Sequence, residues 1–343
     1  MNAKNHTIME KIDFVMIWVD GNDPEWQKEY NRYSGKNGLD ENSTVRYRDW
    51  DLLKYWFRGV EKFAPWVNRV HFVTCGQKPE WLNPNAPKLN LVSHSDYMPA
   101  EHLPTFSSHP IEINLHRIDN LADKFVYFND DCFILNHLPV ERFFRNGLPC
   151  DRAGSTIIED DGFEMANHVI KNNVNCINRH FNKKESIRKN WYKWFNIRYA
   201  THPRCMLHTL QTLPNKEFIK FSEPHFPNAF LKSTLQEVWD KCGDTLEQTS
   251  ASKFRNFDNI NQWLFRDWQI AKGCFTPYDV YKDSISFEIS DSNIERIESI
   301  ITKKKKRLII LNDSTQFASF SQIQSRLNRA MESILPEKCS FEI

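Results

Sequence analysis

Residues 125–135 read Phe125-Val126-Tyr127-Phe128-Asn129-Asp130-Asp131-Cys132-Phe133-Ile134-Leu135. Strand-forming residues run up to two adjacent carboxylates and resume directly after them. Because aspartate is disfavoured in strands, the pair costs stability unless something compensates. A divalent cation that holds a diphosphate would compensate, since Mg²⁺ and Mn²⁺ prefer oxygen ligands and leave room for phosphate oxygens. A strand end capped by Asn-Asp turn chemistry is the alternative interpretation.

Expected strands and helices alternate around this stretch. Apolar runs predict strands at residues 12–19, 70–74, 89–92 and 125–128. Residues 50–63 have helical spacing, residues 110–117 predict a short helix, and the polar residues 33–45 predict a loop. This alternation is typical of a mostly parallel sheet flanked by helices, so we expect an α/β fold.

The pattern changes near residue 155. Residues 164–200 are polar, basic and aromatic, and amphipathic helices are expected at 228–242 and 258–272. A last strand, at residues 307–311, runs into Asn312 and Asp313. We therefore expect a single catalytic domain over the whole chain. Its parts are an α/β core, a mainly helical insertion, and a returning strand with a C-terminal helix, at residues 10–150, 155–275 and 276–343.

Three acidic clusters follow expected strands. They are Asp20 with Asp23, Asp130 with Asp131, and Asn312 with Asp313. Ligands of parallel sheets bind at the carboxyl ends of the strands. An enzyme that acts on a nucleotide sugar needs a carboxylate for a metal, an edge for the base and ribose, and a group for the acceptor hydroxyl. Three strand-end clusters meet that need, although a capped turn would also explain the first of them.

Two basic side chains are further candidates. His225 lies between two prolines, which makes the backbone there stiff. An imidazole exchanges protons near neutral pH, but an ordinary surface histidine is the alternative for one of 12 in the chain. Arg255 precedes an expected helix, where a guanidinium can bind phosphate bidentately or remain a solvated cation.

The basic aromatic stretch of residues 183–199 reads KKESIRKNWYKWFNIRY. Three interpretations stay open for it. It can contact an anionic polymer, lie on an acidic membrane surface, or form a solvated helix packed through its tryptophan and phenylalanine residues.

Composition excludes several classes of protein. A net charge of +1 gives no global field that would select nucleic acid, and no Walker A, G-x-S-x-G or G-x-G-x-x-G motif occurs. None of the eight cysteines forms a C-x-x-C pair. No apolar run approaches the roughly 18–20 residues that cross a bilayer, and the polar N-terminus lacks a secretory signal. We therefore expect a cytoplasmic protein with reduced thiols and no nucleic-acid partner.

Four blocks of sequence stand out together. They are residues 12–24 (IDFVMIWVDGNDP), residues 46–131 from Arg46-Tyr47-Arg48-Asp49 to Phe128-Asn129-Asp130-Asp131, Glu223-Pro224-His225 with Arg255, and the short Leu311-Asn312-Asp313. Together they resemble the Stealth family of hexose-1-phosphate transferases. That family contains bacterial capsular polysaccharide phosphotransferases and is related to the catalytic subunit of the animal GlcNAc-1-phosphotransferase.

The resemblance implies a GT-A-like fold and a sugar-1-phosphate transfer in capsular or surface polysaccharide synthesis. The donor would be a UDP-sugar, with a UDP-N-acetylhexosamine favoured, and the acceptor a polysaccharide or oligosaccharide. The acceptor hydroxyl would attack the β-phosphorus and release UMP. The core at residues 10–150 would bind the nucleotide sugar, and the helical region at 155–275 would bind the acceptor.

The resemblance also implies roles for individual residues. Asp131, with Asp130, would hold Mg²⁺ or Mn²⁺ and so belong to the catalytic machinery; Asn312 and Asp313 would be further ligands, although Ser314 stands where another carboxylate or carboxamide is expected. His225 or Asp20 would be the general base, and Arg255 would stabilise phosphoryl charge. Donor contacts would come from the first two blocks, at Trp18, Asp20, Gly21, Asp23 and Arg117.

Two other functions remain as alternatives. One is a conventional GT-A glycosyltransferase, which attacks the anomeric carbon and releases UDP, and the other is a non-catalytic carbohydrate-binding subunit. Because polymer assembly takes place at the inner membrane face, peripheral association with that membrane or with other capsule enzymes is a further expectation. The sequence leaves open the hexose, the acceptor hydroxyl, the capsule serotype, the oligomeric state and the identity of the general base.

Overall fold

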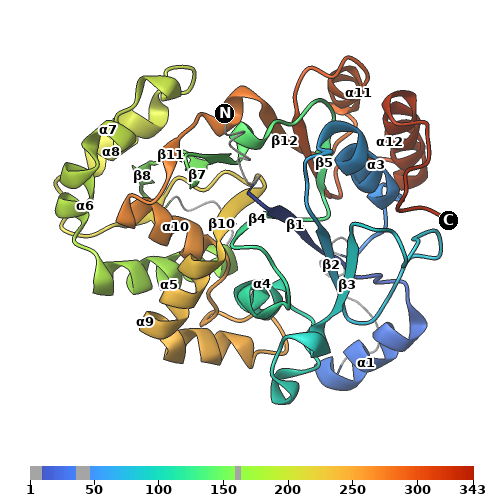
Figure 1. Ribbon diagram of the computed structural model, residues 1–343, viewed down its shortest axis with the longest axis horizontal. Coiled ribbons are helices and arrows are strands. Elements are labelled where there is room, and N and C mark those ends of the chain that lie inside the picture. The colour runs from blue at the N-terminus through green and yellow to red at the C-terminus, as the bar shows by residue number, and fades with distance from the viewer. Residues whose placement is uncertain (1–9, 36–46, 159–163) are drawn as a thin grey trace, which may run out of the picture.

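The computed structural model describes residues 10–35, 47–158 and 164–343. Within them, the central sheet has five strands in the order β10-β4-β1-β2-β3 (Figure 1). The strands are β1 (Ile12–Ile17), β2 (Val70–Thr74), β3 (Leu89–Ser93), β4 (Lys124–Phe128) and β10 (Asn228–Leu231). β1 to β4 are mutually parallel and β10 is antiparallel to β4, so the prediction of an α/β fold with a mostly parallel sheet is confirmed.

Helices cover both faces of this sheet (Figure 1). Successive side chains of a strand point to opposite faces, and accordingly Phe14 and Met16 of β1 belong to one core and Val15 to the other. The first core includes α3 (Leu53–Phe63), α11 (Ile294–Thr302) and α12 (Phe320–Ile334). The second includes α4 (Ser108–Ile113), α5 (Glu164–His180), α9 (Lys232–Ser250) and α10 (Trp263–Lys272).

The apolar run after Asp131 does not extend β4 but enters a second sheet. This sheet has the order β12-β13-β5, with β5 (Cys132–Ile134), β12 (Ser284–Glu288) and β13 (Leu308–Asn312). β13 is parallel to β12 and antiparallel to β5. The end of β13 therefore lies beside the turn between β4 and β5, where the Leu311 N–H donates to the Asp131 carbonyl oxygen at 2.9 Å.

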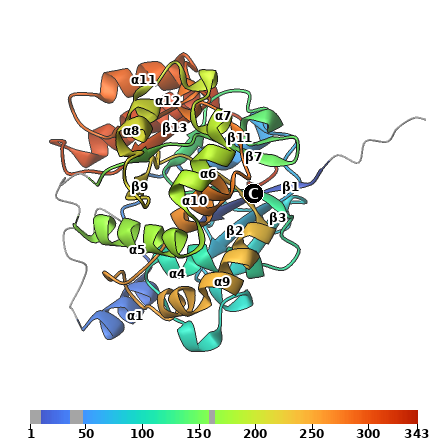
Figure 2. The same cartoon turned by 90° about the vertical axis from the view of Figure 1, so that its left-hand side faces the viewer.

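The remaining elements lie at the periphery. α1 (Pro24–Ser34) begins with proline, and Asp23 caps it by accepting from the Glu25 N–H at 2.9 Å. Helices α6 (Lys183–Lys189), α7 (Trp191–Trp194) and α8 (Arg204–Thr212) lie together on one side of the molecule, which faces the viewer in Figure 2. The short strands are β6 (Phe144–Arg145), β7 (Leu148–Asp151), β8 (Ser155–Thr156), β9 (Lys220–Phe221) and β11 (Thr276–Pro277).

Two helix predictions in the second half of the chain were wrong at their starts. The first four residues of the segment 228–242 form β10, and helix α9 begins at Lys232. Pairing with β4 overrides the helical pattern there, because it buries Ala229 in one core and Phe230 in the other. In the segment 258–272, the helix begins at Trp263.

Smaller differences occur in the first half. The helix predicted at 50–63 begins at Leu53, and the one predicted at 110–117 divides into α4 and a 3₁₀ turn at Leu115–Arg117. Of the loop predicted at 33–45, the first two residues belong to α1 and residues 36–45 lie outside the described part of the chain.

Candidate active site

A cavity of about 1610 Å³ lies at the carboxyl ends of β1 and β4. It is larger than the roughly 300–1,000 Å³ of most small-molecule sites, so it has room for more than one ligand group. Most of the predicted site residues line it, from both halves of the chain. They are Trp18, Asp20, Asp130, Asp131, His225, Arg255, Asn312 and Asp313.

His225 and Asp131 form the most direct contact in this cavity. The Nε2 atom of His225 lies 3.1 Å from Oδ2 of Asp131, and the two side chains are 44% and 23% exposed. Burial acts to lower the pKa of His225, but the hydrogen bond with Asp131 and the nearby carboxylate charges outweigh it and raise the pKa. The imidazole is therefore held by a carboxylate while it still reaches the cavity.

Asp130 extends the acidic pair into the cavity. Its side chain is exposed there, although protein surrounds the group on most sides. Desolvation by this surrounding protein and the charge of Asp131 raise the pKa of Asp130 to about 7. Two adjacent carboxyl groups with mutual repulsion form a site that a cation would stabilise.

The third acidic cluster joins them through the hydrogen bond between Leu311 and Asp131. Asn312 donates from Nδ2 to Oγ of Ser286 at 3.1 Å. The Oδ2 atom of Asp313 is buried and forms an ion pair with Arg48, whose Nε atom lies 3.4 Å away. Burial raises the pKa of Asp313 in spite of the Arg48 charge.

Arg255 is exposed at the cavity wall. Its Nη2 atom donates to Oγ of Ser108 at 3.0 Å, a contact that orients the guanidinium toward α4. The guanidinium thus lines the cavity close to the first residue of α4.

Three predicted donor-binding residues do not line the cavity. Arg117 lies over the ring of Trp239, with its guanidinium carbon 4.4 Å from the centroid. Asp23 caps α1 and accepts from Nε2 of Gln77 at 2.9 Å, which holds the loop after β1 in place. A Cβ atom on Gly21 would lie 2.4 Å from Cβ of Tyr47, so glycine is needed there for close packing.

Several acidic residues of the wall were missed as site residues, and Asp49 and Glu112 are two of them. Asp49 lines the cavity, and desolvation with the charges of Asp51 and Asp20 raises its pKa. Glu112 is buried in α4, where it accepts from the Tyr127 hydroxyl and the Gln262 N–H, both at 3.3 Å. Both residues lie within the second block of the family resemblance, residues 46–131, but no local pattern singled out either side chain as a site residue.

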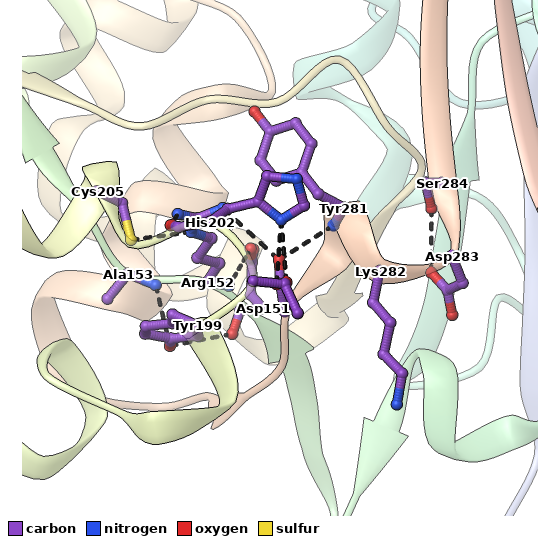
Figure 3. Close-up of polar contacts among 12 residues, drawn as sticks. Asp151, Arg152, Ala153, Tyr199, His202, Cys205, Tyr281, Lys282, Asp283 and Ser284 are labelled. Carbon is purple, nitrogen blue, oxygen red and sulfur yellow. Dashed lines mark hydrogen bonds and ion pairs between the residues drawn. The ribbon is translucent and has the colours of Figure 1, made fainter.

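A second cavity of about 390 Å³ adjoins the first. Glu223 and His225 line both cavities, so the Glu-Pro-His segment forms a shared wall. His202 and Tyr281 also line the second cavity, and their ring centroids are 5.0 Å apart. Figure 3 shows the two rings side by side. Asp279 accepts from the 3₁₀ turn at Tyr281 and lies 3.2 Å from Nδ1 of His202, which fixes this wall.

The residues present suit a hard divalent cation only in part. Asp130 and Asp131 supply carboxylate oxygens, and Asp313, whose Oδ2 atom is paired with Arg48, lines the same cavity. Among the described residues, however, no group of three His, Cys, Asp or Glu side chains is close enough to hold a metal ion. The two adjacent carboxylates therefore fit a cation that takes its remaining ligands from a bound diphosphate.

Known proteins similar to this chain identify its family. The family models for Stealth protein conserved regions 1 and 2 match residues 10–38 and 46–150. The capsular polysaccharide phosphotransferase WcwK of Streptococcus pneumoniae is 39% identical, over 97% of this chain and 98% of its own length. The chain belongs to the Stealth family. The predicted resemblance is confirmed.

Two other Stealth relatives are also named as phosphotransferases. The receptor polysaccharide phosphotransferase WefC of Streptococcus gordonii is 37% identical, over 98% of this chain and the whole of its own. The exopolysaccharide phosphotransferase cps2G of Lactiplantibacillus plantarum is 36% identical, over 96% of each chain. These relatives identify this Stealth protein as an enzyme that transfers phosphorus-containing groups.

The solved structure of the galactosyltransferase LgtC with donor and acceptor sugar analogues covers 94% of this chain and 96% of its own, at 10% identity and a TM-score of 0.39. That likeness is too weak for an inference about fold or substrate. In the described residues, no helix is long and apolar enough to cross a membrane. All eight cysteines are free thiols in the structure.

Proposed function

We propose that this Stealth protein transfers a sugar 1-phosphate from a UDP-sugar to a hydroxyl group of a capsular or surface polysaccharide, with UMP as the second product. An N-acetylhexosamine is the favoured sugar. The contact between His225 and Asp131 is the observation that carries the proposal. It supports the proposal because an imidazole, which can accept a proton, lies beside two adjacent carboxylates in a cavity with room for a nucleotide sugar and part of a glycan.

The proposed reaction forms one bond and breaks another at the β-phosphorus. The acceptor oxygen bonds to the phosphorus while the bond from that phosphorus to the bridging oxygen breaks. UMP leaves with the bridging oxygen, and the hydroxyl proton passes to His225, with Asp20 as the other candidate base. Proton transfer of this kind contributes about 10²–10⁴-fold to a rate.

Charge neutralisation is the other requirement, because phosphoryl transfer depends mostly on positioning and electrostatics. Arg255 offers a planar guanidinium at the cavity wall for the transferring group. Mg²⁺ or Mn²⁺ would be held by Asp130 and Asp131, with Asn312 and Asp313 as further predicted ligands, and would neutralise diphosphate charge.

The second cavity suggests a direction for the acceptor. It adjoins His225, and its lining includes Tyr281 and the exposed Ser286. Aromatic faces and hydroxyl groups suit a neutral sugar ring. The donor would therefore bind in the larger cavity, and the acceptor chain would reach His225 from the smaller one. The reaction would take place in the cytoplasm, where UDP-sugars are made.

Phosphorus NMR of the purified protein tests the reaction. The protein is incubated with Mg²⁺, a panel of UDP-N-acetylhexosamines and short capsular oligosaccharides. Release of UMP with a new phosphodiester signal is the expected result. Release of UDP without a phosphodiester would contradict the proposal and identify a conventional glycosyltransferase.

A further inference from the structure

Large apolar side chains are exposed in one short segment of this protein. Of the ten that are exposed in the described residues, five lie between residues 191 and 210. They are Trp191, Tyr192, Ile197, Leu207 and Leu210, and Ile197 is 87% exposed. Concentrated exposure of this kind marks an interaction surface rather than ordinary surface scatter.

The backbone beneath these side chains is anchored. In α8, Cys205, Thr209 and Thr212 are buried, and the opposite face carries Leu207 and Leu210. In α7, Trp194 is fully buried while Trp191 and Tyr192 are exposed. Each helix thus packs through one face and presents apolar groups on the other.

The same part of the chain is rich in exposed cations. Five exposed lysine and arginine residues lie in α6, α8 and the segments next to α7, at Lys184, Arg188, Lys189, Arg198 and Arg204. Glu185 is the only acidic residue of the sequence from 183 to 212, and Lys189 lies 2.6 Å from it. The chain as a whole carries a net charge of only +1, so this surface is a local concentration of positive charge.

We propose that this surface, formed by α6, α7, α8 and the turn Ile197–Tyr199, docks on an anionic lipid bilayer. Figure 2 shows the three helices on one side of the molecule. Tryptophan and tyrosine favour the membrane interface, isoleucine and leucine enter the acyl boundary, and lysine and arginine are attracted to anionic headgroups. A soluble polyanion would use the cations but would gain nothing from Ile197. The inference is independent of the proposed reaction.

Vesicle flotation tests this docking with the full chain. One set of vesicles contains equal parts of phosphatidylglycerol and phosphatidylcholine, and the other contains phosphatidylcholine alone. We expect binding to the anionic vesicles and little to the neutral ones. The double variant Trp191→Ala, Ile197→Asp should bind anionic vesicles about tenfold more weakly, because it removes apolar contact and adds a negative charge.

The matched control is Leu91→Asp, which changes an exposed apolar side chain on β3. It should bind as the unchanged protein does. Equal binding by the double variant, or no binding to anionic vesicles, would overturn the proposal. Binding to soluble dextran sulfate would also overturn it, if that binding is stronger than vesicle binding and is unchanged by Ile197→Asp. A dimer that sedimentation detects, that depends on Ile197 and that forms without vesicle binding would overturn it as well.

Discussion

The Nε2 atom of His225 lies 3.1 Å from Oδ2 of Asp131, although 94 residues separate them in the chain. The turn between β4 and β5 carries Asp131, and the stiff segment before β10 carries His225. Because β10 pairs with β4 by backbone hydrogen bonds, the two segments have a fixed spatial relation. The contact therefore depends on sheet pairing rather than on the flexibility of either side chain.

His225→Ala should lower the turnover number about 10²–10⁴-fold while the protein remains folded, because it removes the proposed base. Asp131→Asn should have an effect of similar size. Turnover is measured as UMP release, and folding by circular dichroism. The matched control is His137→Ala, which changes an exposed histidine outside the cavity lining. Wild-type turnover in His225→Ala would transfer the role of base to Asp20.

Arg255→Lys should lower turnover about tenfold or more, since a point charge cannot replace the planar fork of a guanidinium. The hydrogen bond from Arg255 to Ser108 allows a control, because Ser108→Ala removes that contact and keeps the guanidinium. The control should lose less activity than Arg255→Lys. If the lysine variant transfers sugar phosphate at the native rate, Arg255 acts only as a surface cation.

Gly21→Ala should destabilise the protein by about 1–3 kcal/mol, because the new Cβ would meet Cβ and the carbonyl oxygen of Tyr47 at 2.4 and 2.7 Å. The free energy of unfolding in urea measures this. Gly243→Ala is the matched control, since a Cβ there has no atom within 4 Å among the described residues. In helix α9 that control should be neutral or stabilising by up to about 1 kcal/mol. Equal stability of the two variants would show that the loop after β1 can move to accommodate the new Cβ atom at little cost in free energy.

Asp13 should make stability depend on pH in the acid range. Burial acts to raise its pKa, but hydrogen bonds from His71, Asn68 and the Ala122 N–H outweigh this and lower it below the ordinary 3.8. Its contribution is therefore complete above about pH 3.8 and lost as the pH falls through the lower folded-state pKa, because the unfolded chain then binds the proton more tightly.

Urea unfolding at several pH values tests this, with Asp13→Asn for comparison. The variant should lose about 1–3 kcal/mol at neutral pH, since its amide cannot accept all three hydrogen bonds, and should show a flatter decline in acid. A decline as steep as that of the unchanged protein would assign the acid sensitivity to other carboxyl groups.

Much of the central sheet could be predicted from local patterns. Val70–Thr74 matches its predicted strand, and the strands around Phe14 and Val126 differ by one or two residues at their ends. A short apolar run with a polar stop identifies a buried strand without reference to the rest of the chain. For the same reason the acidic pair after β4 was recognisable as a candidate ligand site.

Longer-range features could not be predicted in this way. Asn228–Leu231 had the composition of a helix start, and only a free edge on β4 makes it a strand. Glu112 is a cavity residue because α4 lies at the carboxyl end of the sheet, which no local pattern reveals. Arg117 matched a family block, yet the fold places it over Trp239.

The sequence by itself determined the α/β class, the family and the acidic strand ends, because these depend on residue order and local periodicity. Only the tertiary structure decided that the end of β13 lies beside the Asp131 turn, through antiparallel pairing of β13 with β5, and that His225 contacts Asp131. A strand can pair with any free strand edge of the fold. Which edge it pairs with depends on how side chains from the whole chain are buried, and a local stretch of sequence does not contain that information.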